Sequence, residues 1–378
     1  MSQAGAPHRQ RSATQAVFGD FYRGKRVFVT GSTGFKGSWL CHWLTLLGAE
    51  VGGYALIPNT EPNLWTKLDL DARISQRMAD VRDHAALSAA VAAFKPDLVF
   101  HLAAQPLVRD SYADPKGTFD TNVGGTVNLL EALRAQPQIQ ACVIVTTDKC
   151  YENREWIWGY RETDPMGGHD PYSASKGAAE LVVSSYRRSF FERSLLNLAS
   201  ARAGNVIGGG DWSKDRLVVD FVKAMSAGQA LELRRPHATR PWQHVLEPLS
   251  GYLALGMRLA GAQGPGFAEA WNFGPEESSV VTVEVLARCL VSCWGSGQVV
   301  VDTSHTHPHE AGLLKLDCSK AKHRLGWHGV WGIQRTVEQT VAWYRSVAAG
   351  QDPLAITERQ ISDYVRDAAA LHLPWAHV

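Results

Sequence analysis

A glycine-rich turn between an apolar strand and a helix is the feature that most limits how this chain can fold. The run Arg26–Thr30 is short, β-branched and apolar, which predicts a buried strand. The segment Phe35–Gly48 carries apolar residues at helical spacing. The turn between them has the form G-x-x-G-x-x-G and reads Gly31-Ser32-Thr33-Gly34-Phe35-Lys36-Gly37. Free N–H groups at a helix start, next to bare glycine backbone, suit a pyrophosphate, so the segment predicts a dinucleotide site.

The second predicted strand bears on which dinucleotide is bound. It covers Val51–Leu56, and no acidic residue follows it before Glu61. An acid at this position normally holds the ribose 2′-hydroxyl of NAD, and an arginine accommodates the 2′-phosphate of NADP. Neither is present here, although Asn59 and Thr60 can bond a hydroxyl. We expect NAD rather than NADP.

Strands and helices alternate along the first half of the chain. Further strands are predicted at 97–103, 141–147 and 196–203, and helices at 84–94, 125–134 and 172–191. This alternation predicts an α/β fold, a Rossmann-type doubly wound parallel sheet with helices on both faces.

The pattern loosens after residue 204, where glycine, proline and tryptophan become frequent. We expect a smaller C-terminal α/β domain there, with the ligand cleft between the two domains. The expected division is a disordered tail at 1–16, a Rossmann domain at 17–204 with a return segment at about 243–273, and a substrate-binding domain at 205–242 and 274–378.

Composition excludes several classes of function. A chain of 378 residues has room for a large core, and its net charge of +1 indicates neither a nucleic-acid partner nor an anionic membrane. No apolar run reaches the ~18 residues that span a bilayer. Residues 1–16 are polar and do not resemble a signal peptide. The six cysteines include no C-x-x-C pair, which favours reduced thiols and a cytoplasmic location.

Tyr172 and Lys176 are candidates for proton transfer. They stand four residues apart and therefore share one face of the predicted helix. A tyrosine is a poor base at neutral pH unless nearby positive charge lowers its pKa. Lys176 and a positive nicotinamide ring can supply that charge, so that Tyr172 takes a proton from a hydroxyl while hydride leaves the carbon.

Thr147-Asp148-Lys149 follows the apolar run Cys142–Val145. It therefore stands at the carboxyl end of a parallel strand, where open α/β sheets bind their ligands. The Thr147 hydroxyl can bond a substrate hydroxyl and the Tyr172 oxygen. Asp148 can serve as a general acid if burial keeps it protonated. Lys149 is either a base, if desolvated, or a cation that stabilises an enolate.

These motifs resemble those of the extended short-chain dehydrogenases/reductases, and within them the nucleotide-sugar 4,6-dehydratases that act on CDP-glucose. The resemblance runs from Gly24 almost to the C-terminus. Besides the motifs above, it rests on segments 101–109 (HLAAQPLVR), 122–126 (NVGGT), 203–212 (AGNVIGGGDW), 240–245 (RPWQHV), 309–311 (HEA) and 316–320 (LDCSK). Related enzymes for dTDP-glucose read T-D-E where this chain has Thr147-Asp148-Lys149.

The resemblance implies a lyase that uses NAD and CDP-D-glucose. Tyr172 takes the proton of the C4 hydroxyl as hydride leaves C4, and Lys176 holds the nicotinamide ribose. Water then leaves across C5 and C6, with Asp148 as the acid and Lys149 at the position of the base. Hydride returns to C6 and gives CDP-4-keto-6-deoxy-D-glucose.

The resemblance also implies further contacts. Those to the cofactor, besides the glycine turn, are Asp80, Val81, Leu102, Ala103, Ala104, Asn122 and Thr146. Those to the substrate are Gln105, Arg109, Asn205, Arg240, His309 and Glu310, and Trp212 and Trp242 are expected near the ligand. Arginine suits a diphosphate because its guanidinium is planar and permanently charged. We expect no metal site at His305, His307 and His309, because these histidines lack a matched carboxylate or cysteine partner.

Two other functions stay open. A 4-epimerase of the same superfamily shares the redox groups, although it needs no acid–base pair at C5 and C6. A regulatory NAD(P)-binding protein without turnover needs neither Tyr172 nor Lys176 at this spacing. The resemblance also implies a homo-oligomer, either a dimer or a tetramer.

Overall fold

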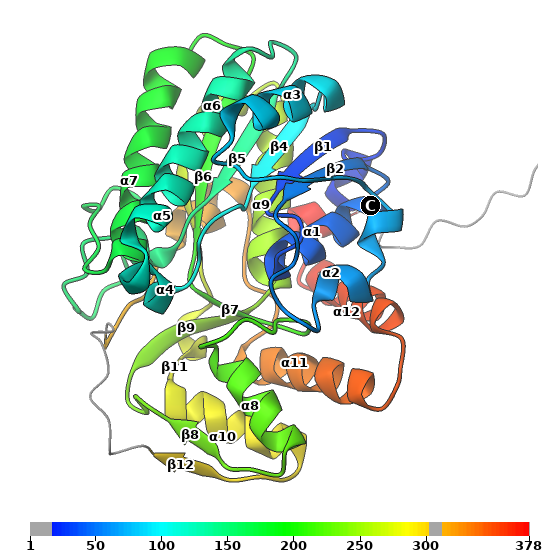
Figure 1. Ribbon diagram of the computed structural model, residues 1–378, viewed down its shortest axis with the longest axis vertical. Coiled ribbons are helices and arrows are strands. Elements are labelled where there is room, and N and C mark those ends of the chain that lie inside the picture. Colours follow the sequence, from blue (N-terminus) through cyan, green and yellow to red (C-terminus); the bar gives the residue numbers. More distant parts are fainter. Residues whose placement is uncertain (1–16, 302–311, 378) are drawn as a thin grey trace, which may run out of the picture.

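The computed structural model describes residues 17–301 and 312–377. A seven-stranded sheet forms its upper body (Figure 1), and every neighbouring pair of its strands is parallel. Its order is β10 (Ala270–Phe273), β6 (Asn197–Ala203), β5 (Ala141–Val145), β4 (Leu98–His101), β1 (Arg26–Thr30), β2 (Glu50–Ala55) and β3 (Ser75–Met78). The predicted Rossmann-type fold is confirmed.

Helices cover both faces of this sheet, because the central strands are apolar on both sides. On one face lie α3 (His84–Phe94), α6 (Gly125–Arg134) and α7 (Pro171–Tyr186), whose buried side chains share a core with β4 and β5. On the other lie α1 (Phe35–Leu46), α9 (Leu246–Ala260) and α12 (Pro353–Ala370). Three short helices, α2 (Leu64–Lys67), α4 (Val108–Ala113) and α5 (Pro115–Phe119), lie in the loops.

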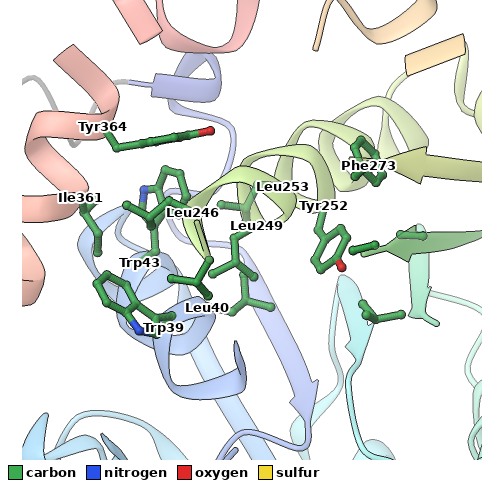
Figure 2. Packing of buried hydrophobic residues seen from close by; sticks show 14 of the residues in the cluster. Trp39, Leu40, Trp43, Leu246, Leu249, Tyr252, Leu253, Phe273, Ile361 and Tyr364 are labelled. Atoms are coloured by element: carbon green, nitrogen blue, oxygen red, sulfur yellow. The ribbon is translucent and has the colours of Figure 1, made fainter. Parts of the chain in front are cut away.

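The core on the second face joins distant parts of the sequence. Figure 2 shows Trp39 and Trp43 of α1 beside Leu246 of α9 and Tyr364 of α12. All four side chains are buried. Burying large rings of this kind is the main favourable contribution to folding. This core therefore fixes α1, whose first turn carries the glycine motif, against the C-terminal helices.

A smaller body lies below the sheet in Figure 1. It contains a three-stranded sheet of β11 (Val280–Thr282), β9 (Thr239–His244) and β7 (Asn205–Ile207), and a pair of strands, β12 (Val299–Val301) and β8 (Leu231–Leu233). Its helices are α8 (Leu217–Ser226), α10 (Val283–Trp294) and α11 (Ile333–Ala348). β7 follows β6 after a single residue, so the chain passes directly from one body to the other at the carboxyl end of β6. In the described part of the chain, no helix is long and apolar enough to cross a membrane.

Candidate active site

A cavity of about 660 Å³ lies at the carboxyl ends of the parallel strands. Its walls come from both bodies, since it is lined by the glycine turn, by the loops after β4 and β5, and by β7, β8 and β9. The strand order reverses between β1 and β4, and open α/β sheets bind ligands at such a point. The predicted site residues that line the cavity are Gly31, Gly34, Phe35, Lys36, Gly37, Leu102, Ala104, Arg109, Thr146, Thr147, Lys149, Tyr172, Lys176, Asn205, Arg240 and Trp242.

The glycine turn has the geometry that a dinucleotide requires. Gly31 has φ +71°, and a Cβ at Gly37 would lie 2.0 Å from the Gly31 carbonyl oxygen. The turn therefore closes tightly onto the start of α1. At Gly34 an added Cβ would meet nothing nearer than 3.4 Å, and no side chain caps the helix there. The helix N–H groups thus face open space, and these residues fit a pyrophosphate.

Several predicted contact residues do not line the cavity. Thr33 Oγ1 donates to the carbonyl of Leu56, and Asp80 forms an ion pair with Arg82. Trp212 packs against Trp343. The others outside the lining are Val81, Ala103, Gln105, Asn122 and Asp148. His309 and Glu310, with His305 and His307, lie outside the described residues.

Asn122 braces a cavity loop. Its Nδ2 donates to Ser175 Oγ at 2.8 Å, and its Oδ1 accepts from the Gln105 backbone N–H at 2.8 Å. The Gln105 side chain in turn bonds Thr118 and the backbone of Leu107. Both side chains are therefore occupied within the protein, where they shape the loop after β4.

Tyr172 lies in the first turn of α7 and faces the cavity. The Asp170 side chain caps this turn by accepting from the Ser173 N–H at 2.9 Å. Burial raises the pKa of Tyr172 to about 12, while a hydrogen bond with Thr147 and the charge of Arg216 oppose the rise. The sequence predicted that Lys176 and a nicotinamide ring together lower this pKa; among the groups of the protein itself, desolvation of the phenolate outweighs the positive charges. The cation that acts on it is Arg216, which the sequence analysis missed.

Arg216 is the residue before α8, in the smaller body. It also lines the cavity, and its Nε is buried without a hydrogen-bond partner among the described residues. A single arginine before an amphipathic helix carries no spacing signal, so only the approach of the two bodies identifies it. Arg234 lies on the same side, and its Nη1 is 3.2 Å from Asp215, which also pairs with Arg109 at 3.1 Å.

Two lysines, the buried Lys176 and the half-buried Lys36, stand at the glycine turn. Lys176 Nζ donates to the carbonyl of Val145 at 3.3 Å, and burial lowers its pKa to about 8. Lys36 was expected only as part of the cofactor turn. Burial, followed by the charges of Lys176 and Arg216, lowers the pKa of Lys36 to about 7. The protein thus disfavours the charged form of both lysines on the cofactor side of the cavity.

Asp148 and Lys149 form a contact at the end of β5. Asp148 is fully buried, and its Oδ1 accepts from Thr147 Oγ1 at 3.0 Å and from Lys149 Nζ at 3.5 Å. Its Oδ2 has no hydrogen-bond partner among the described residues. A Cβ at Gly204 would lie 3.3 Å from that oxygen, so Gly204 packs close to it. A buried carboxyl oxygen in this position can exchange a proton with a ligand.

Comparison with known proteins agrees with this geometry. Residues 28–340 match the family model described as GDP-mannose 4,6 dehydratase. The chain is 52% identical to the CDP-glucose 4,6-dehydratase of Salmonella typhimurium, over 92% of this chain and 98% of that protein. It is 29% identical to the dTDP-glucose 4,6-dehydratase of Streptomyces antibioticus, over 87% of this chain and 95% of that one.

Solved structures show the same fold. A dTDP-glucose 4,6-dehydratase from Streptomyces venezuelae with NAD and TYD bound aligns with a TM-score of 0.73 and 25% identity, over 87% of this chain and 99% of that chain. A UDP-glucose 4-epimerase from Thermotoga maritima aligns with a TM-score of 0.74 at 22% identity, over 85% and 99%. The glycine turn, Tyr172, Lys176 and Lys149 line one cavity, and Lys149 contacts the buried Asp148. This chain belongs to the GDP-mannose 4,6 dehydratase family of the extended short-chain dehydrogenases/reductases and is a nucleotide-sugar 4,6-dehydratase.

Proposed function

We propose that this enzyme converts CDP-D-glucose to CDP-4-keto-6-deoxy-D-glucose and water, with NAD as its cofactor. The observation that carries the reaction is that Tyr172 and Lys149 line one cavity with a dinucleotide turn, and that Lys149 contacts the buried Asp148. The relative at 52% identity supports CDP-glucose as the substrate.

The protein would hold the cofactor through backbone groups and lysines. The N–H groups at the start of α1 would bind the pyrophosphate, and Lys176 would hold the nicotinamide ribose. When bound, NAD supplies a hydride acceptor for C4, a hydride donor for C6 and a positive ring charge. Two related dehydratase structures were solved with NAD, which supports this choice.

Tyr172 and Thr147 would handle the first proton. The Tyr172 oxygen accepts the proton of the C4 hydroxyl, and Thr147 orients both oxygens. The protein alone leaves the pKa of Tyr172 at about 12, since burial dominates. Tyr172 therefore needs a further positive charge close to its oxygen before it can act as a base near neutral pH.

Asp148 and Lys149 would carry out the elimination. Lys149, as a neutral amine, takes the C5 proton and becomes an ammonium. Asp148, as a carboxylic acid, protonates the C6 hydroxyl, which leaves as water. When C6 receives hydride, the Lys149 ammonium, which lies 3.5 Å from Asp148, would return its proton to C5. Asp148 would regain a proton from solvent, and Tyr172 would release the proton of the C4 hydroxyl to solvent, so that every group returns to its starting form.

The smaller body would bind the nucleotide sugar. Asn205 and the guanidinium groups of Arg216, Arg234 and Arg240 line the same cavity, and arginine matches diphosphate oxygens in shape and charge. For the residues from 17 on we infer the domain division stated above, which is supported by β10 joining the parallel sheet beside β6. The exception is α12, which lies within 274–378 but packs against α1 on the large sheet. The proposal includes a homo-oligomer and a cytoplasmic location, and the six cysteines without disulfides support the latter.

Incubation with CDP-glucose, dTDP-glucose and UDP-glucose in parallel tests the function. We expect a 4-keto product, seen by its alkaline absorbance, to form fastest from CDP-glucose. A C4-epimerised sugar without loss of water would instead show that the enzyme is an epimerase. A faster reaction with another nucleotide sugar would overturn the proposed substrate and keep the dehydratase chemistry.

A further inference from the structure

Helix α7 carries a third buried titratable residue, Glu180, which the reaction above does not use. Tyr172, Lys176 and Glu180 follow one another at four-residue intervals and therefore lie on one face of the helix. Glu180 is only 4% exposed. A buried carboxylate destabilises the fold unless its oxygens are paired, so the partners of Glu180 indicate its role.

Both carboxylate oxygens of Glu180 are occupied. Oε1 accepts a hydrogen bond from Thr146 Oγ1. Oε2 accepts from Ser200 Oγ at 2.7 Å and from Arg202 Nη2 at 2.8 Å. Glu180 thereby ties α7 to the end of β5 and to β6. Thr146 lines the cavity and directly precedes Thr147, so the Glu180–Thr146 hydrogen bond is next to the catalytic residues in the chain.

The pairing keeps Glu180 ionised. Arg202 is also buried, and its Nη1 donates to the Tyr151 hydroxyl at 2.6 Å and to the Glu162 carbonyl at 3.1 Å. Burial by itself would raise the pKa of Glu180, but Arg202 and the three hydrogen bonds together lower it below its ordinary value. Glu180 is therefore a fixed negative charge inside the protein.

That charge acts on Lys176. Burial lowers the pKa of Lys176, and the charge of Glu180 is the largest effect that opposes the fall. The other titratable groups around Lys176 are Cys150 after β5, Lys36 on α1 and His101 on β4. Burial raises the pKa of the Cys150 thiol and lowers that of His101 to about 3, so both are uncharged at neutral pH. Among these groups around Lys176, Glu180 is therefore the one that carries a negative charge at neutral pH.

We propose that Glu180 is a positioning residue that keeps Lys176 in its ammonium form and fixes Thr146 at the end of β5. The inference rests on the proposed function, because that function requires the Lys176 ammonium to hold the nicotinamide ribose beside Tyr172. Glu180 touches neither substrate nor cofactor and acts through Lys176. Without it, Lys176 would lose its nearby anion and would face the uncompensated charge of Arg202.

The test is the pH profile of kcat in Glu180→Gln, which keeps the size of the side chain and removes its charge. In the parent enzyme, activity should fall with rising pH as Lys176 loses its proton. We expect this alkaline limb to move to lower pH by about one unit or more in the variant. The matched control is Ser200→Ala, which removes one hydrogen bond from the same carboxylate and should leave the limb in place.

A second variant covers the case in which Glu180→Gln does not fold. Glu180→Gln combined with Arg202→Gln leaves no unpaired buried charge, and the limb should again move to lower pH. The proposal would be overturned if the alkaline limb of kcat keeps its parent position in either folded variant. It would also be overturned if Ser200→Ala shifts this limb as much as Glu180→Gln does.

NAD titration, followed by quenching of tryptophan fluorescence across the same pH range, separates this inference from the proposed function. The pH at which NAD affinity falls should move to lower values with the kcat limb. This readout needs no CDP-glucose. If the parent enzyme forms no 4-keto product, the proposed function is rejected, but NAD titration still measures the role of Glu180. If the pH dependence of NAD affinity is the same in the parent and in Glu180→Gln, the role of Glu180 is rejected.

Discussion

Lys149 Nζ lies 3.5 Å from Oδ1 of Asp148, although the two residues are neighbours in the sequence. Consecutive residues of a strand point to opposite faces. Here the strand ends at Val145, and a single 3-10 turn, Asp148–Cys150, follows. The turn brings both side chains together, with Asp148 fully buried and Lys149 28% exposed. The acid and the base of the proposed elimination are therefore adjacent groups that can share one proton.

Tyr172→Phe keeps the ring and removes the proton acceptor. We expect turnover to fall by at least ~10²-fold, the scale of losing a general base. NAD binding should survive, because the glycine turn is unchanged. Single-turnover absorbance of reduced nicotinamide measures the loss, and near-parent turnover would remove Tyr172 from the mechanism.

Thr147→Val removes the hydrogen bond that opposes the raised pKa of Tyr172. That pKa should rise further, and the base form should require a higher pH. The acidic limb of the pH profile is therefore expected to move to higher pH. An acidic limb that keeps its position, with only a uniform loss of rate, would show that Thr147 orients substrate without tuning Tyr172.

Asp148→Asn should leave hydride removal possible and slow the loss of the C6 hydroxyl. The asparagine side chain has the shape of the aspartate side chain, but it has no acidic proton to donate. We expect reduced cofactor and a 4-keto-glucose nucleotide to accumulate on the enzyme. Mass spectrometry of quenched single turnovers follows both, and water loss at the parent rate would contradict the acid assignment.

Lys149→Met and Lys149→Arg separate the two roles of this lysine. Both should suppress exchange of the C5 hydrogen with solvent deuterium by at least ~10²-fold if Lys149 is the base, since neither side chain can take the proton. Arginine keeps the cation, so retained exchange in Lys149→Arg alone would instead support an electrostatic role. Exchange at the parent rate in Lys149→Met would exclude any action of Lys149 at C5.

Glu247 makes stability depend on pH. Burial raises its pKa to about 7, while the Trp331 and Val330 N–H groups and the Tyr364 hydroxyl oppose the rise. The folded state therefore holds a proton that the unfolded state releases above its ordinary pKa of 4.5. Folding stability is expected to fall by about 3 kcal/mol as the pH rises from about 4.5 to 7.

Glu247→Gln cannot titrate and should lose that part of the pH dependence. Thermal unfolding of the parent protein and of Glu247→Gln between about pH 4.5 and 7 measures this pH dependence. The Tm of the parent protein should fall more steeply with rising pH than the Tm of Glu247→Gln. Parallel slopes would show that Glu247 is not the titrating group.

Local patterns predicted much of the fold and part of the site. The strand Arg26–Thr30 and the helices His84–Phe94 and Gly125–Arg134 have the predicted bounds. They were predictable because a buried strand must be apolar on both faces and a covering helix must be apolar on one. The short, mostly exposed β3, Ser75–Met78, has neither pattern and was missed. The predicted helix 172–191 is α7 followed by a π-helical turn, Arg187–Phe191.

The sequence by itself determined the strand–turn–helix of the glycine motif, the Tyr172–Lys176 spacing and the position of Asp148 and Lys149 after a strand. These depend on residues near one another in the chain. Only the tertiary structure decided which charges act on them. The charge of Arg216, in the smaller body, acts on Tyr172, and Arg202 on β6 pairs with Glu180 on α7. Burial sets the direction of the Tyr172 and Lys176 pKa shifts, and burial is a property of the packed chain that no local pattern records.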